Sequence, residues 1–169
     1  SLLAGLEPFL TGGEMIRSVK LERTSWNSLP WKFEAGTPAY AEAVGLHAAI
    51  DYLHAVGLEA IDAHEHAITD YALGRLAEVP GLRIIGPQTA AARGGVVSFV
   101  LEDVHPHDIA EILDRHAVCV RAGHHCTQPL IERLGLAATV RASFYLYTTE
   151  AEIDRLVDGL LDVRRVMGV

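Results

Sequence analysis

The sequence contains few cysteines, few basic residues and no long apolar run. Only two of its 169 residues are cysteine, too few for the disulfide scaffold of a small secreted domain. No apolar stretch approaches the ~18 residues that a membrane-spanning helix needs. Lys and Arg number 14 against 22 Asp and Glu, a formal net charge of −8. Because nucleic acids and anionic membranes bind basic faces, the sequence predicts neither as a partner.

The composition is that of a folded domain. Half of the residues are hydrophobic and 21% are charged, which allows a sizeable buried core. The length suits one domain, or one domain with part of another. The first residues lack the basic start and apolar stretch of a signal peptide. We therefore expect a soluble, cytoplasmic α/β or α+β domain.

The pattern changes near residue 38, where we expect a domain boundary. Residues 1–37 contain one predicted strand, over 14–21, and otherwise loops with little core of their own. In residues 38–169, helices come first and short strands then alternate with helices. This order indicates an α+β fold, with a small mixed β-sheet that helices cover on one face.

Hydrophobic periodicity and helix-stop signals predict the individual elements of residues 38–169. Thr37 is expected to cap the first helix, with Pro38 at its first position, where the missing N–H costs nothing. The expected helices span 39–56, 58–79, 106–116, 129–134 and 149–167, and the expected strands span 82–85, 95–101, 118–120 and 139–145.

The densest group of reactive side chains lies in residues 121–129, RAGHHCTQP. Cys126 is expected in a loop just before a short helix, beside His124 and His125 and near Arg121. Imidazoles, a guanidinium and a helix start each favour a thiolate over a thiol, and a thiolate is a nucleophile. The alternative is a small core residue flanked by two surface histidines.

The other cysteine and the other histidines are weaker candidates for a reactive or metal-binding site. Cys119 stands between two valines in a predicted buried strand, so we expect it to be inert. The paired histidines admit a metal site, but residues i and i+2 of a helix point to different faces, so His64 and His66 cannot easily chelate one ion. A small metal-binding protein is therefore the weakest alternative, and no metal site is predicted.

Two further features are candidate anion sites. Gly36 and Thr37 precede a long predicted helix, whose free N–H groups favour a phosphate, although an ordinary helix cap explains them as well. Arg141 lies in an otherwise apolar or small-residue strand, where a guanidinium needs an anionic partner and a carboxylate matches its fork. An internal salt bridge or an edge position would explain Arg141 without a ligand.

Together these motifs resemble the group II, SufS-type cysteine desulfurases of the class V aminotransferases. In particular, RAGHHC differs from the longer, Ser/Ala-rich cysteine loop of group I. The segments that carry the resemblance, in the family's order, are GGEMI (12–16), FEAGTP (33–38), VHPHD (104–108), RAGHHCTQPL (121–130) and VRAS (140–143). The resemblance implies the small C-terminal domain of a fold-type I pyridoxal-phosphate enzyme over 38–169, preceded by the tail of its large domain over 1–37.

The resemblance also implies roles for individual residues. Cys126 would attack the sulfur of the bound substrate and become a persulfide. Arg141 would hold the substrate carboxylate, and Arg121 would line the same pocket. Thr37, with Gly36 before it, would contact the phosphate of pyridoxal 5'-phosphate across a homodimer interface.

Other residues of the motifs are expected near the active loop or toward a partner. His124, His125 and Gln128 belong to the loop itself. His107, in HPHD, resembles the histidine that SufS-type enzymes use toward a zinc-bearing, SufU-type sulfur acceptor. A zinc-free acceptor of the SufE type is the alternative partner.

The implied reaction converts L-cysteine to L-alanine and supplies sulfur for iron–sulfur cluster assembly. However, Lys20 and Lys32 are the only lysines, and neither lies in the Ser-x-His-Lys setting of the family. The family's chains are also more than twice this length. We therefore expect the C-terminal portion of such an enzyme, inactive by itself. The alternatives are a non-catalytic docking module for the sulfur acceptor and a selenocysteine lyase.

Overall fold

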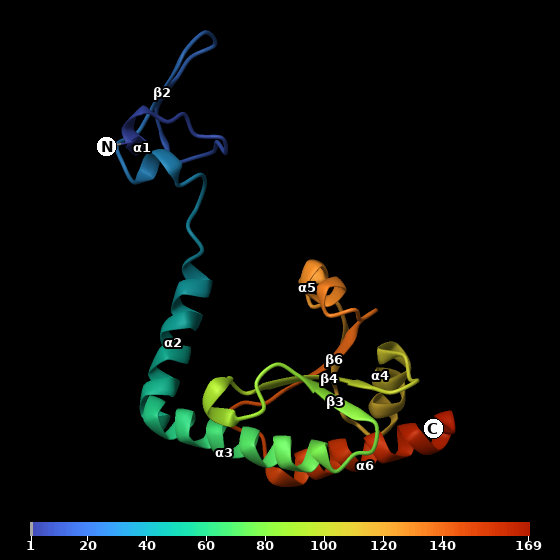
Figure 1. Cartoon of the computed structure of the whole chain (residues 1–169). Coiled ribbons are helices and arrows are strands. Elements are labelled where there is room, and N and C mark those ends of the chain that lie inside the picture. Colours follow the sequence, from blue (N-terminus) through green and yellow to red (C-terminus); the bar gives the residue numbers. More distant parts are fainter. Residues whose placement is uncertain (1) are drawn as a thin grey trace. The chain divides into compact units, whose positions relative to one another are not determined.

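The computed structural model describes residues 2–169, which fall into two units that divide between Ala55 and Val56 (Figure 1). The sequence pattern predicts a boundary near residue 38 instead. The two positions differ by one helix, α2 (Tyr40–Val56), because the change in composition marks where this helix begins and the contacts mark where it ends. The assignment of residues 1–37 to the tail of a larger domain stays a prediction.

The first unit contains a short hairpin, two short helical segments and nearly all of helix α2. Strand β1 (Ile16–Val19) pairs antiparallel with β2 (Thr24–Trp26), although the sequence predicts a loop over 25–31. The turn closes where the Lys20 N–H donates to the Arg23 carbonyl at 2.9 Å. The sequence pattern therefore does not reveal β2, because its turn and its partner strand β1 are only a few residues long. The remaining elements are α1 (Leu2–Gly5) and the 3-10 helix η1 (Trp31–Phe33).

Thr37 does not cap α2. The first backbone bonds of this helix run from the Tyr40 N–H to the Pro38 carbonyl at 2.9 Å and from the Ala43 N–H to the Ala39 carbonyl at 3.0 Å. The helix therefore begins later than predicted, which leaves Thr37 exposed in the preceding loop. Sequence patterns locate helix ends less well than helix centres.

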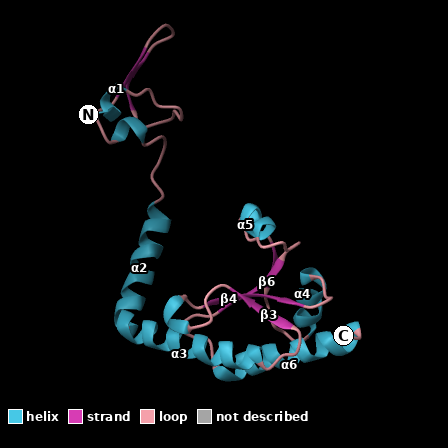
Figure 2. Ribbon diagram, in the orientation of Figure 1, coloured by secondary structure: helices cyan, strands magenta, loops and turns pink. Residues whose placement is uncertain are grey.

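The second unit is built on a four-stranded sheet in the order β3-β4-β6-β5 (Figure 2). Its strands are β3 (Leu82–Ile85), β4 (Val96–Leu101), β5 (Arg121–Gly123) and β6 (Thr139–Ser143). The α+β class is confirmed, but all three pairings are antiparallel, so the sheet is not mixed. The reason is that β6 lies between β4 and β5, so the two strands on either side of α4 (Pro106–Arg115) are not neighbours.

Three helices pack on this sheet and form the core with it. They are α3 (Leu58–Ala77), α4 (Pro106–Arg115) and α6 (Glu150–Met167), and Figure 1 shows α3 and α6 running side by side along the sheet. The inward residues predicted for α6 are buried as expected: Ile153, Leu156, Leu160 and Val163. Within residues 2–169, no helix combines the length and apolar character required to cross a bilayer.

Residues 118–120 do not form the expected strand. Helix α4 ends in a turn at Ala117, which has φ +56°, and the Val118 N–H donates back to the Leu113 carbonyl at 3.0 Å. Val118 and Val120 then pack on the core while Cys119 between them is exposed, because alternate residues of an extended segment face opposite sides. The expectation of a buried Cys119 is therefore wrong.

Candidate active site

Cys126 lies in an exposed turn between the edge strand β5 and helix α5 (Gln128–Arg133). Gly123 ends β5 with φ +133°. The turn itself uses two consecutive left-handed residues that are not glycine, His125 at φ +53° and Cys126 at φ +61°. Such residues each cost about 1 kcal/mol or more, so other contacts must hold this backbone.

Both histidines of the turn bind the segment that leads into β6. His124 Nε2 lies 3.0 Å from the Ala137 carbonyl oxygen. His125 Nε2 lies 2.9 Å from Thr139 Oγ1 and 3.2 Å from the Thr139 carbonyl oxygen. The turn is closed further by Thr127, whose N–H and hydroxyl donate to the His124 carbonyl at 2.9 and 2.8 Å.

His125 is held as a neutral imidazole. Burial lowers its pKa below the ordinary value, and the positive charges of Arg141 and Arg121 act in the same direction, while the hydrogen bond to the Thr139 backbone opposes them. A neutral ring carries one N–H, and a carbonyl can only accept, so the bond to the Thr139 carbonyl places this proton on Nε2. Nδ1 is then an acceptor, and it is buried without a hydrogen-bond partner within residues 2–169.

Two arginines face each other beside the turn. Arg121 on β5 pairs directly with Arg141 on β6, and Arg121 Nη2 donates to Cys126 Sγ at 3.7 Å. Like charges at directly opposed positions destabilise a sheet, and a bound anion would offset this. Over the described residues neither arginine forms a salt bridge, and Arg141 Nε is buried without a partner. An internal salt bridge therefore does not explain Arg141.

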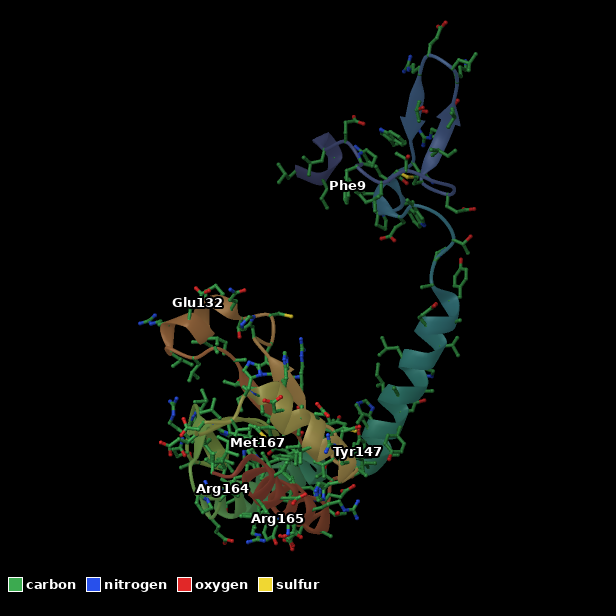
Figure 3. All side chains as sticks on the ribbon, turned by 90° about the vertical axis from the view of Figure 1, so that its right-hand side faces the viewer. Phe9, Glu132, Tyr147, Arg164, Arg165 and Met167 are labelled. Atoms are coloured by element: carbon green, nitrogen blue, oxygen red, sulfur yellow. The ribbon has the colours of Figure 1, made fainter. Side chains whose placement is uncertain are left out.

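The hydrogen bonds of Gln128 and His107 are made to residues other than Cys126 and the two arginines. Gln128 Nε2 donates to Glu132 Oε1 at 2.9 Å, so this side chain lies along α5, where Figure 3 labels Glu132. His107 is exposed in the first turn of α4, and its N–H donates to His105 Nδ1 at 3.3 Å. The two rings are edge to face, with centroids 5.2 Å apart.

His64 and His66 of α3 bind different partners, as helix geometry predicts. His64 Nε2 lies 2.9 Å from the Thr148 carbonyl oxygen, while His66 Nδ1 lies 2.9 Å from the Asp62 carbonyl oxygen. Among the residues that the structure describes, no three His, Cys, Asp or Glu side chains are grouped as metal ligands.

Of the two predicted phosphate contacts, Gly36 and Thr37, Thr37 is the one whose polar group has no partner assigned within residues 2–169. Gly36 has φ +87° and donates its N–H to the Gly13 carbonyl at 2.9 Å, so this N–H is already used. Thr37 beside it is exposed. Lys32 is buried, with Nζ donating to the Ala4 carbonyl at 3.1 Å. Lys20 lies in the hairpin turn.

Sequence reasoning predicts Cys126, Arg121 and Arg141 as site residues; the structure places the two arginines on neighbouring strands and Cys126 in the turn that follows β5. The same reasoning does not identify Thr139, whose hydroxyl and carbonyl bind His125. Thr139 is buried on β6 opposite Gly123, and its role follows from this pairing, which no local pattern signals.

Residues 1–156 match the aminotransferase class-V family, so the chain belongs to that family. It is 58% identical over 167 residues to a probable cysteine desulfurase of Streptomyces coelicolor, and 52% identical over 159 residues to a cysteine desulfurase of Haloferax volcanii. These matches cover 99% and 94% of this chain but 40% and 37% of the relatives, so the chain spans about 40% of their length.

Solved structures give the same fold. The cysteine desulfurase CsdA of Escherichia coli, in an S-sulfonic acid form, superposes with a TM-score of 0.83 at 32% identity, over 95% of this chain and 39% of that one. The apo cysteine desulfurase of Thermococcus onnurineus superposes with a TM-score of 0.84 at 38% identity, over 96% and 40%. The expected family and fold class are thus confirmed.

Proposed function

We propose that the protein carrying this chain is a cysteine desulfurase that uses pyridoxal 5'-phosphate and receives the substrate's sulfur on Cys126. The observation that supports this proposal most is the Cys126 turn, where an exposed sulfur accepts a hydrogen bond from Arg121 beside an unpaired Arg141. The relatives named cysteine desulfurases, at 52% to 58% identity, support the same reaction.

Cys126 acts as the nucleophile. Its thiolate attacks the sulfur of L-cysteine, so that an S–S bond forms while the substrate's C–S bond breaks. The electron pair of the broken bond stays with the substrate carbon, which takes up a proton and leaves as L-alanine. The enzyme retains the sulfur as a persulfide. Arg121 Nη2 donates to the sulfur that makes this attack, at 3.7 Å, and so helps to orient it.

Arg141 orients the substrate. Its guanidinium carries two parallel N–H donors that match a carboxylate, and its buried Nε has no partner within residues 2–169. With Arg121 directly opposite, a carboxylate at this position would also neutralise two facing positive charges. This arrangement supports Arg141 as the residue that binds the substrate carboxylate.

The chain fits one part of a pyridoxal-phosphate site and not another. The exposed Thr37 hydroxyl suits a phosphate contact, with Gly36 shaping the loop before it. When bound, the cofactor supplies an electron sink that weakens bonds of the substrate amino acid. Neither lysine suits covalent attachment, because Lys32 is engaged by the Ala4 carbonyl and Lys20 lies in a hairpin turn. We infer that the attaching lysine lies in another part of the protein, and that the 169-residue chain alone is inactive.

The wider role belongs to the same proposal. The persulfide sulfur would pass to an acceptor for iron–sulfur cluster assembly in the cytoplasm, from a homodimeric enzyme. The exposed His107 is our candidate contact for a zinc-bearing acceptor of the SufU type, because a neutral imidazole is a good zinc ligand. A SufE-type acceptor would not need it. Selenocysteine as a substrate would bind the same Arg141 guanidinium and react with the same nucleophile, Cys126.

The decisive experiment uses the whole protein, loaded with cofactor and given L-cysteine. Alanine and a persulfide on Cys126 are expected, and Cys126→Ala should lower alanine formation by at least about a hundred-fold, since loss of a nucleophile removes the covalent step. Cys119→Ala is the matched control and should keep the rate. Absence of alanine and persulfide from the unmodified protein would favour a docking module instead.

A further inference from the structure

Several hydrogen bonds hold the strained turn that presents Cys126, but only one residue of the turn is shielded from solvent. Of residues 124–127, His125 alone is not exposed. We propose that His125 is the positioning residue of the active cysteine: through its bond to Thr139, it fixes the Cys126 sulfur relative to the arginine pair. This inference deepens the proposed desulfurase function and rests on it.

The first step of the argument is strain. His125 and Cys126 both occupy the left-handed region, and such a backbone persists only where surrounding contacts hold it. The other ties of the turn lie in solvent: His124 binds the carbonyl of an exposed alanine, Ala137, and Thr127 closes onto His124 itself. Hydrogen bonds in solvent compete with water, so they restrain a turn less than a bond to a buried strand does.

The second step is the position of the anchor. Thr139 is 1% exposed and lies directly opposite Gly123, the last residue of β5. Thr139 and Arg141 are two apart on β6, so their side chains share one face of the strand. His125 therefore ties the turn to the same strand face that carries Arg141. In this way the distance between the nucleophile and the carboxylate-binding residue is set by the sheet rather than by a free loop.

The third step is the chemical requirement of the contact. The His125 ring is neutral, with its N–H on Nε2 donating to Thr139. A glutamine can place an amide N–H close to the position of Nε2, whereas a leucine fills similar space and donates nothing. A positioning role through this hydrogen bond thus predicts rescue by His125→Gln and not by His125→Leu.

The test measures alkylation of the whole protein without substrate, under limiting reagent and with mass mapping. Cys119 is exposed in the same chain, so the ratio of the Cys126 rate to the Cys119 rate corrects for reagent and concentration. His125→Leu is expected to lower this ratio about five-fold, the value of one net hydrogen bond, because the sulfur moves away from Arg121. His125→Gln should restore it to within about two-fold of the unmodified protein.

Two further variants control the result. His66→Leu removes an exposed histidine that binds only its own helix, and it should leave the ratio unchanged. Thr139→Val removes the hydroxyl at constant shape and should lower the ratio, which keeps the test valid if His125→Leu does not fold. An unchanged ratio in His125→Leu, or equal losses in the Gln and Leu variants, would overturn the proposal.

Turnover of L-cysteine separates this proposal from the proposed function. His125→Leu should lower kcat more than it raises KM, because Arg141 remains in place to bind the carboxylate. If the unmodified protein forms no persulfide while the alkylation ratio falls as expected, the proposed function fails and the positioning of Cys126 stands. If turnover is present and the ratio does not respond, the positioning role fails alone.

Discussion

Single residues at the end of the sheet determine what this site can bind. Arg121 and Arg141 are directly opposed on neighbouring antiparallel strands, an arrangement that is unfavourable unless an anion lies close by. Arg121 of this pair also donates to the Cys126 sulfur at 3.7 Å. Under the proposed function, the two guanidinium groups would meet the substrate carboxylate and Cys126 would meet its sulfur.

Arg141→Lys tests the carboxylate contact at this scale. In the whole protein we expect KM for L-cysteine to rise about ten-fold or more, with kcat less affected, because a point charge replaces two parallel donors poorly. Steady-state alanine formation gives both constants. Arg83→Lys on β3 is the control, since this arginine is exposed on the opposite edge strand. An unchanged KM would exclude Arg141 from the substrate site.

The residues of the site differ in how well the sequence predicts them. Cys126, Arg121 and Arg141 can be predicted because a reactive side chain in a short motif, or a charge within an apolar strand, is visible locally. The exposure of Cys119 cannot, since it depends on how the chain leaves α4 at Ala117. The part that Thr139 plays depends on its partner strand and is equally invisible in the local pattern.

At the scale of the element, α6 shows how strongly local signals can specify a helix. Thr149 and Glu152 form a reciprocal cap: the Thr149 N–H donates to Glu152 Oε2 at 2.8 Å, and the Thr149 side chain accepts from the backbone. Hydrogen bonds from the Thr149 backbone and then from its hydroxyl lower the pKa of Glu152. The helix begins at Glu150, one residue after the start that its periodicity predicts, with Thr149 as the capping residue.

Thr149→Ala is expected to lower the free energy of unfolding by about 1 kcal/mol, because it removes the side-chain oxygen on which the reciprocal cap of the first turn depends. Urea unfolding at neutral pH measures the change. Thr149→Ser keeps an oxygen at the same position and should lose much less. If both variants lost the same amount, the methyl group rather than the cap would be responsible.

Elements without such local signals are the ones that the sequence predicts poorly. The strand β2 has three residues and depends on β1 for its existence, and β5 has three residues that are defined by β6. Their hydrogen bonds are made across the sheet, so propensity within the segment says little about them. Helices form their bonds internally, which is why α3, α4 and α6 lie close to their predicted ranges.

For the second unit as a whole, polar links connect the helices that cover the sheet. Asp154 on α6 accepts from Arg75 Nε at 2.8 Å and from the Tyr71 hydroxyl at 2.9 Å, and both partners lie on α3. Hydrogen bonds from Arg75 and then from Tyr71 lower the pKa of Asp154. The α3–α6 pair is thus stabilised by a carboxylate that must be ionised.

The lowered pKa of Asp154 determines the direction in which stability changes with pH. A carboxyl with a lowered folded-state pKa stabilises the fold above its unfolded pKa, near 4, and this contribution is lost as the pH falls through the folded-state value. We expect Asp154→Asn to lower the urea midpoint at pH 7, and the difference from the unmodified chain to shrink toward pH 3. Asp158→Asn, exposed on the same helix, is the control. A difference that does not change with pH would contradict this.

The exposed turn at Cys126 also has a consequence for oxidation. A sulfur as exposed as that of Cys126 is open to peroxide, and the thiolate is the form that attacks peroxide. The first product, a sulfenic acid, is reversed by thiols, whereas the sulfinic and sulfonic acids that follow are not reversed by ordinary reductants. Each oxidised molecule keeps its fold and its arginine pair but has no nucleophile, so the active fraction of a preparation depends on the reductant present.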